Sequence, residues 1–336
     1  MKKIFLIAAI FAALTTSVFA KTKKADTSKI KVVTTIFPEY DWVREIAGES
    51  KNVELTLLIG NGVDLHSYQP SVQDIAKISN ADIFIFVGGE SDAWVENALK
   101  NATNKNMKVI NLMEILGDKV KLEEIKEGMQ AEEEEEHEHH HHEGEHHHDD
   151  DEDEEEEEEY DEHVWLSLRN AKILSTEIAA ALCQKDSANA ATYKANLASY
   201  TAKLDALDSK YNSAVLSAAK KTVLFGDRFP FRYLVDDYNI DYFAAFVGCS
   251  AETEASFETI IFLSKKVDEL GLNTVLKIET GDDKIARTII QNSKNKNAKI
   301  LTLDSIQSTT LKQAKSGITY LKIMEDNLKV IEEALK

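Results

Sequence analysis

The chain has 336 residues, with 39 Lys and Arg against 59 Asp and Glu, and a formal net charge of −20. The acidity is local, because 21 of the acidic residues lie between positions 132 and 162 and the rest of the chain is close to neutral. A near-neutral folded part offers no basic surface for nucleic acid. With three Pro, 13 Gly and two Cys, collagen-like and disulfide-scaffold classes are excluded, and the length predicts two domains.

The first 20 residues have the pattern of an export signal. Residues 1–3 form a short positive start, residues 4–14 are almost wholly apolar, and residues 17–20 end in a small-x-small sequence. This pattern predicts a signal peptide cleaved after Ala20, with an uncleaved anchor as the alternative. Because no Cys lies near the cleavage point, we expect a periplasmic or otherwise extracytoplasmic protein that is not a lipoprotein.

Short apolar runs alternate with amphipathic stretches along the rest of the chain. Strands are expected at 32–36, 53–58, 83–87, 108–112, 222–225, 241–246, 274–278 and 299–303. Helices are expected between them, at 40–47, 72–78, 94–101, 257–270 and 284–291. This twice-repeated alternation predicts an α/β fold of two lobes, each with a mostly parallel sheet flanked by helices.

Residues 187–220 interrupt this alternation. They contain no Gly or Pro, and their apolar residues recur at spacings of three and four. They predict one long rigid helix of about 50 Å that joins the lobes, with two kinked helices as the alternative. The expected organisation is therefore a signal peptide at 1–20, an N-terminal lobe at 28–186, the linking helix at 187–220 and a C-terminal lobe at 221–336.

Residues 131–160 form an acidic, histidine-rich insert in the N-terminal lobe. The insert has no apolar periodicity and is predicted to be disordered. Imidazole and carboxylate groups together chelate transition metals, so the insert predicts auxiliary metal capture that fades below about pH 6 as the imidazoles protonate. The alternative is a solvated loop that has no function. Its histidines are His137, His139, His140, His141, His142, His146, His147 and His148.

The two other histidines, His66 and His163, lie in loops beside predicted strands and helices. Such loops are where α/β sheets build their sites, although a histidine there is also commonly a hydrogen-bonded surface residue. Zinc takes His and carboxylate ligands, usually four in total. Glu279 and Asp227, each at the end of a predicted apolar strand, are the candidate carboxylates.

Four motifs carry a family resemblance. They are Val-Thr-Thr-Ile-Phe-Pro at 33–38, Gly-Val-Asp-Leu-His-Ser-Tyr-Gln-Pro at 62–70, Ala-Asp-Ile-Phe-Ile-Phe-Val-Gly at 81–88 and Asp-Glu-His-Val-Trp-Leu at 161–166. As a set they resemble the zinc and manganese solute-binding proteins of ABC importers, over nearly all of the mature chain and including the position of the insert. The resemblance implies two α/β lobes, a rigid backbone helix and a metal site in the cleft between the lobes.

The resemblance also implies a set of ligands. His66 matches the first family histidine, in a turn where Leu65 replaces the usual proline, and His163 matches the second. Glu279 matches the acidic ligand at the end of a strand in the C-terminal lobe.

The third family histidine is missing. An ungapped match places Arg228 in its position, and a guanidinium cation cannot ligate a metal. Asp227 could supply an oxygen instead, a histidine of the insert could fill the position, or the site could keep water. Asp227 could equally be paired with Arg228 or Arg232 and have no role at the metal.

We therefore expect a monomeric protein without enzymatic activity that captures zinc in the cleft and delivers it to an ABC permease with its ATPase. Neither nucleic acid nor a small organic substrate is expected. Manganese is the alternative metal, because losing a histidine favours oxygen ligands. A stand-alone zinc sink or chaperone and a zinc-dependent hydrolase are the rival functions. Cys183 and Cys249 are expected to be free thiols, with a disulfide as the alternative.

Overall fold

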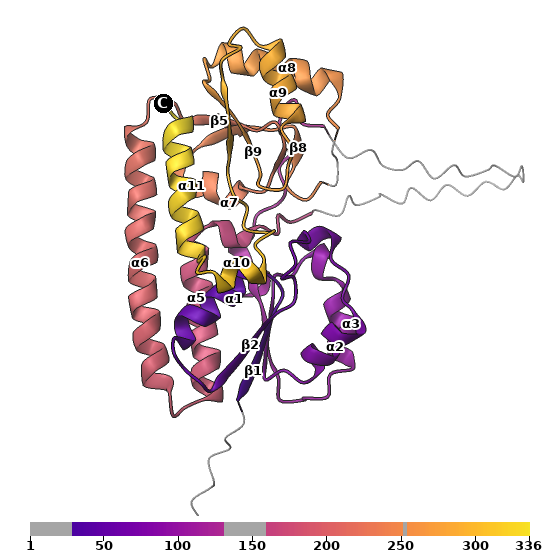
Figure 1. The fold of residues 1–336 in the computed structure, drawn as a ribbon, viewed down its shortest axis with the longest axis vertical. Coiled ribbons are helices and arrows are strands. Elements are labelled where there is room, and N and C mark those ends of the chain that lie inside the picture. Colours follow the sequence, from indigo (N-terminus) through magenta and orange to yellow (C-terminus); the bar gives the residue numbers. More distant parts are fainter. Residues whose placement is uncertain (1–28, 131–158, 251–253) are drawn as a thin grey trace, which may run out of the picture.

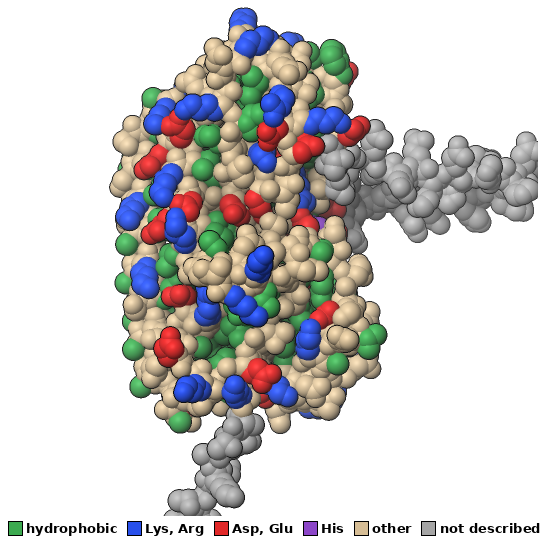
Figure 2. Space-filling view, in the orientation of Figure 1, with side chains coloured by type: hydrophobic (Ala, Val, Ile, Leu, Met, Phe, Trp, Pro, Cys, Tyr) green, Lys and Arg blue, Asp and Glu red, His purple; other side chains and the backbone are tan. Residues whose placement is uncertain are grey.

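The computed structural model describes residues 29–130, 159–250 and 254–336 (Figure 1). The predicted signal peptide and residues 131–158 of the predicted insert lie outside these ranges. The fold class is α/β, as predicted: two lobes built on parallel strands flanked by helices are stacked along one long helix. Charged side chains of both signs are interspersed over the face shown in Figure 2. No helix in the described part combines the length and apolar character needed to cross a membrane.

The N-terminal lobe contains a four-stranded, fully parallel sheet of order β2-β1-β3-β4. Its strands are β1 (Ile30–Thr34), β2 (Val53–Leu57), β3 (Ile83–Phe86) and β4 (Lys108–Asn111), within two residues of the predicted segments. The chain order reverses beside β1, and in such sheets the loops after the strands open a crevice for ligands. The helices around this sheet are α1 (Phe37–Ala47), α2 (Val72–Ser79), α3 (Trp94–Lys100), α4 (Leu112–Leu116) and α5 (Leu168–Lys185).

The C-terminal lobe is built from short parallel pairs. β5 (Thr222–Leu224) pairs with β7 (Asp241–Phe243), β9 (Thr274–Lys277) with β10 (Lys299–Thr302), and β6 (Arg228–Phe229) with β8 (Phe246–Val247). An isolated parallel bridge from Phe225 to Leu276 connects β5 to β9. The flanking helices are α7 (Arg232–Tyr238), α8 (Phe257–Glu269) and α9 (Lys284–Asn292).

The long helix α6 (Ala190–Ser217) runs beside both lobes in Figure 1. It packs against α1 and α5 of the N-terminal lobe and against the C-terminal helix α11 (Tyr320–Ala334). Its inward face carries buried aromatic side chains, and the hydroxyl of Tyr211 donates to the carbonyl of Met324 at 2.7 Å. The predicted linking helix is thus one continuous element, shorter than expected by a few residues at each end.

The C-terminal segment contacts the N-terminal lobe, which the sequence pattern did not indicate. The backbone N–H of Tyr320 donates to the Asp41 carboxylate at 2.6 Å, and the Arg44 guanidinium donates to the carbonyls of Ala314 and Ile318 at 2.8 and 2.7 Å. α10 (Leu311–Lys315) and α11 therefore tie α1 to the rest of the molecule. One apolar cluster runs through both lobes as a result.

A buried carboxylate supports the start of α1. Glu39 is fully buried, and its carboxylate accepts hydrogen bonds from the backbone N–H groups of Thr35 and Ile36 at 2.8 and 3.3 Å. Burial, reinforced by the charge of Asp92, raises the pKa of Glu39 from 4.5 to about 8. The folded protein therefore keeps a proton on Glu39 at pH values where the unfolded chain has lost it.

This difference predicts a pH-dependent stability. Between about pH 5 and pH 8 the folded state binds the extra proton, so the free energy of unfolding falls as the pH rises. In Glu39→Gln, which keeps a hydrogen-bond acceptor but cannot ionise, the fall should be smaller by a few kcal/mol at most, since one pKa unit corresponds to about 1.4 kcal/mol. Urea unfolding across this range measures it, with the exposed Glu96→Gln as the control. Equal slopes in the two variants would contradict the prediction.

Candidate metal centre

His66 is fixed at the carboxyl edge of the N-terminal sheet. It lies in the 3-10 turn η1 (Leu65–Ser67) after β2, and its backbone N–H is capped by the Asp64 carboxylate at 3.1 Å. Leu65 anchors this turn because its side chain is fully buried. The ring Nδ1 lies 2.7 Å from the hydroxyl of Ser91, in the loop after β3. Two loops of the same sheet edge therefore orient one imidazole.

His163 is fixed from the opposite side and is fully buried. It directly precedes the 3-10 turn η4 (Val164–Leu166), and its ring Nδ1 lies 3.0 Å from the Asp161 carboxylate. The hydroxyl of Tyr233 donates to the carbonyl of Asp161 at 2.7 Å. This contact ties the turn to the C-terminal lobe, because Tyr233 belongs to α7.

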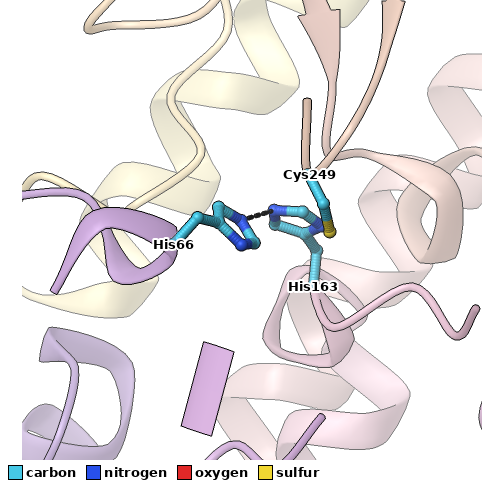
Figure 3. Close-up of side chains that lie close together, drawn as sticks. All are labelled: His66, His163 and Cys249. Atoms are coloured by element: carbon cyan, nitrogen blue, oxygen red, sulfur yellow. Dashed lines mark hydrogen bonds between the residues drawn. The ribbon is translucent and has the colours of Figure 1, made fainter. Parts of the chain in front are cut away.

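The two imidazoles face each other, with 3.2 Å between their Nε2 atoms (Figure 3). Two nitrogens that each lie about 2.0–2.1 Å from a tetrahedral zinc are about 3.3 Å apart. The side chain of Gln307 also reaches this point: when its amide donates to Asp64 at 2.8 Å, its oxygen lies 2.9 Å from Nε2 of His163. When Nδ1 of His163 donates to the Asp161 carboxylate at 3.0 Å, Nε2 has the free lone pair that metal binding needs. The Gln307 contact belongs to the other tautomer, in which Nε2 carries the proton and donates to the Gln307 oxygen.

His66 stays neutral over a wide pH range. Burial, helped by the neighbouring His163 and Arg228 and opposed by Asp64, lowers the pKa of His66 from 6.5 to about 3. A neutral imidazole is the form that binds a metal. The local electrostatics therefore hold His66 ready as a ligand.

Cys249 is the residue that sequence reasoning missed. Within the described residues, one group of three His, Cys, Asp or Glu side chains has ligand atoms that all lie within 4.8 Å of one another, and it consists of His66, His163 and Cys249 (Figure 3). Both cysteines are free, as expected. Burial, with the charges of Glu123 and other nearby carboxylates, raises the pKa of the Cys249 thiol. Cys249 follows the strand β8 of the C-terminal lobe. A position just after a strand was also the reason to predict Glu279 as a ligand.

A cavity of about 630 Å³ opens beside His66 and Cys249. Acidic side chains line much of it, and Glu162 contributes a buried Oε2 that has no hydrogen-bond partner and lies 3.6 Å from Nδ1 of His66. Burial raises the pKa of Glu162. Tyr160, which ends the predicted insert, also lines this cavity. The acidic residues in the lining are Glu90, Glu123, Glu159 and Glu162.

The two predicted carboxylate ligands lie outside this group of three. Glu279 follows β9 and accepts hydrogen bonds from the backbone N–H and hydroxyl of Ser305 and from the hydroxyl of Ser308, at 2.8, 2.9 and 3.0 Å. Asp227 accepts from the backbone N–H groups of Arg228 and Ile278 at 2.9 and 3.1 Å and lines a separate cavity. Both carboxylates lie at strand ends, as predicted, but each is held by its own loops.

Arg228 makes a contact that the sequence did not suggest. Its guanidinium pairs with the Asp64 carboxylate, two residues before His66, and Asp227 receives only its backbone N–H. Burial opposes ionisation of Asp64, but Arg228 and then His66 outweigh it and lower the pKa of Asp64 below its ordinary value. The alternative, in which the Asp227 side chain pairs with Arg228 or Arg232, is not what the structure has, because Arg232 contacts Glu124 at 3.5 Å and Asp236.

Known proteins resemble this chain over most of its length. A family model described as zinc-uptake complex component A, periplasmic, matches residues 32–334. The chain is 33% identical over 333 residues to the zinc-binding lipoprotein AdcA of Streptococcus pneumoniae, covering 99% of this chain and 61% of AdcA. It is 28% identical over 335 residues to the high-affinity zinc uptake system protein ZnuA of Bacillus subtilis, covering 99% and 97% of the two chains.

Solved structures of other proteins share the fold of this chain. The crystal structure of the Zn(II)-bound ZnuA-like domain of S. pneumoniae AdcA superposes with a TM-score of 0.68 at 26% identity, covering 92% of this chain and 99% of that domain. The metal-dependent lipoprotein YcdH of B. subtilis, at 24% identity and a TM-score of 0.70, shares the fold over 92% of this chain and 100% of its own. The chain spans about 61% of the length of AdcA, so AdcA as a whole is a longer protein.

One expectation is wrong. We expected the chain not to be a lipoprotein, but the S. pneumoniae relatives that are 33% identical to it are named zinc-binding lipoproteins. The expectation rested on the missing Cys near Ala20, in a segment outside the described residues. A polarity pattern in a leader does not decide how a mature chain is held at a membrane.

The family match covers nearly all of the described chain, and the two facing histidines lie within it. The family is a zinc-uptake component and not a family of enzymes, in agreement with the expectation. The chain belongs to the zinc-uptake complex component A family of solute-binding proteins, the ZnuA family.

Proposed function

We propose that this chain captures zinc between its lobes and delivers it to an ABC permease driven by an ATPase. The observation that carries the proposal is the 3.2 Å approach of the two Nε2 atoms of His66 and His163. This spacing fits two ligands of one tetrahedral zinc. Relatives named for zinc binding or zinc uptake support the choice of zinc.

Glu279 is the proposed oxygen ligand. Its carboxylate is held by the loop after β10, which contains Ile306 at φ 66°. A β-branched residue in this left-handed region costs on the order of 1–3 kcal/mol. We propose that a shift of this loop would free Glu279 to bind the metal. Two imidazoles with one carboxylate favour zinc over manganese, which prefers oxygen ligands.

Delivery requires the site to open, because ligands drawn from both lobes would otherwise hold the ion. The turn of His66 and the strand of Arg228 lie on opposite sides of the cleft and are joined by the Arg228–Asp64 ion pair. Separating the lobes would break this ion pair and, at the same time, move the ligands of one lobe away from those of the other. We assign that separation to docking on the permease.

The histidine-rich insert is proposed to raise the local zinc concentration. Glu159 and Tyr160, at the described end of this segment, line the acidic cavity beside His66. Metal held weakly by many imidazoles would then be released next to a tighter site.

Replacing His66 tests the cleft site. In His66→Ala, zinc affinity measured by competition with a chelator should fall by more than about 100-fold, because outer-shell contacts alone contribute about 10–100-fold and His66 is a direct ligand. Gln69→Ala, an exposed residue two positions after η1, is the matched control. Unchanged affinity in His66→Ala would remove His66 from the site.

Deleting residues 132–158 tests the insert while keeping Tyr160 and its bridge to Leu122. Calorimetric titration should show one tight zinc site, as in the full chain, with fewer weakly bound ions. Zinc uptake by cells carrying the cognate permease should fall only when zinc is scarce. Loss of the tight site on deletion would mean that the insert supplies a ligand. Unchanged uptake at scarce zinc would leave the insert without its proposed role.

A further inference from the structure

We propose that Cys249 is a direct ligand of the bound metal, so that a thiolate joins the two imidazoles and Glu279 in a centre that selects soft or borderline divalent ions. The inference rests on the proposed function and names a ligand that the family resemblance did not supply. It starts from a gap, because the residue in place of the third histidine is Arg228, whose guanidinium is paired with Asp64.

The position of Cys249 is built into the fold. Ligand atoms of Cys249, His66 and His163 lie within 4.8 Å of one another, against about 3.6 Å between sulfur and nitrogen in a tetrahedral zinc shell. A shift of about 1 Å, or a rotation of the Cys249 side chain, would bring its sulfur to that distance from the two imidazole nitrogens. The three residues follow β2, precede η4 and follow β8, so the site joins three separate segments.

Gly248 allows this approach. A Cβ atom at Gly248 would lie 3.0 Å from the Cε1 atom of His163 and 2.9 Å from the carbonyl oxygen of Phe229. The missing side chain lets the end of β8 pack directly onto the imidazole. The backbone N–H of Cys249 also donates to the Glu123 carboxylate at 3.1 Å, which fixes the cysteine in place.

The surroundings of Cys249 point to a cation. Cys249 and His66 line the same acidic cavity, and Glu162 places a buried carboxylate oxygen with no hydrogen-bond partner there. Glu162 is 3% exposed. A buried, unpartnered carboxylate oxygen is costly unless a positive charge compensates it. A metal ion bound by His66 and Cys249 would supply that charge.

A thiolate ligand changes which metal the site prefers. Thiolate and imidazole suit zinc and other soft or borderline ions, whereas manganese prefers oxygen ligands. When the metal binds, it replaces the thiol proton, which is released to solvent. The centre should therefore bind zinc and cadmium tightly and reject manganese.

Cobalt(II) provides a direct test on the full chain under reducing conditions. Cobalt bound to a thiolate absorbs strongly in the near ultraviolet, and cobalt bound only to imidazole and carboxylate does not. Because this band requires a thiolate, the histidines of the insert cannot produce it. The chain has two cysteines in total, so only these two residues could be its source. We expect the band to grow to one equivalent of cobalt, to disappear on addition of zinc and to be absent in Cys249→Ser and Cys249→Ala.

Cys183→Ser is the matched control and should keep the band, because Cys183 lies on α5 and contacts the carbonyl of Ala190. Zinc affinity should fall about 10-fold or more in Cys249→Ser, since loss of a ligand costs at least as much as loss of an outer-shell contact. Manganese should compete better in this variant than in the unmodified chain.

The outcomes separate this inference from the proposed function. If the unmodified chain binds zinc tightly through His66 but shows no thiolate band, Cys249 is not a ligand and the transport proposal stands. A band that survives in Cys249→Ser also overturns the inference. If neither the unmodified chain nor the variants have a tight site that depends on His66, the proposed function itself fails.

Discussion

The facing of two imidazoles, one fully buried and one partly buried, is the constraint on which the site depends. Nε2 of His66 and Nε2 of His163 lie 3.2 Å apart, although 96 residues separate them in the chain. Each ring is held at its other nitrogen, by Ser91 in one case and Asp161 in the other. Hydrogen bonds of this kind, at the ring nitrogen that faces away from the partner imidazole, fix the orientation of each ring before a metal arrives. The two candidate histidine ligands are therefore already oriented in the protein itself.

The way the lobes are joined explains how such a site could both hold and release an ion. α6 runs beside both lobes, and the C-terminal segment returns to pack Tyr320 against Trp42 of α1, with ring centroids 5.4 Å apart. The lobes therefore share one apolar core along this side. On the cleft side, polar contacts such as the Arg228–Asp64 pair connect them. Polar contacts exchange with water more readily than a packed core, so opening is cheapest at the cleft.

Acidic groups accumulate behind and beside the histidines. Asp92 accepts hydrogen bonds from Val87 and Gly88, yet burial raises the pKa of Asp92 to about 7, and the charge of Glu162 adds to this effect. Glu39 and Glu162 have raised pKa values for the same main reason, which is burial. Buried carboxylates close to one another are unfavourable in an empty site. A divalent cation near Glu162, as proposed above, would offset part of that cost.

The sequence by itself determined most of the strands, the long helix, the α/β class and the two cleft histidines, because periodicity, strand-end position and motif spacing are local properties of the chain. It did not indicate the short strand β6 or separate β8 from β7. It did not indicate Cys249, the Arg228–Asp64 pair or the packing of the C-terminal segment on α1. Those depend on which loops the folded lobes bring face to face, and no spacing rule relates residues that meet across a cleft. The surroundings of Glu279 and Asp227 were likewise decided by tertiary structure, because neighbouring loops supply the donors that hold each carboxylate.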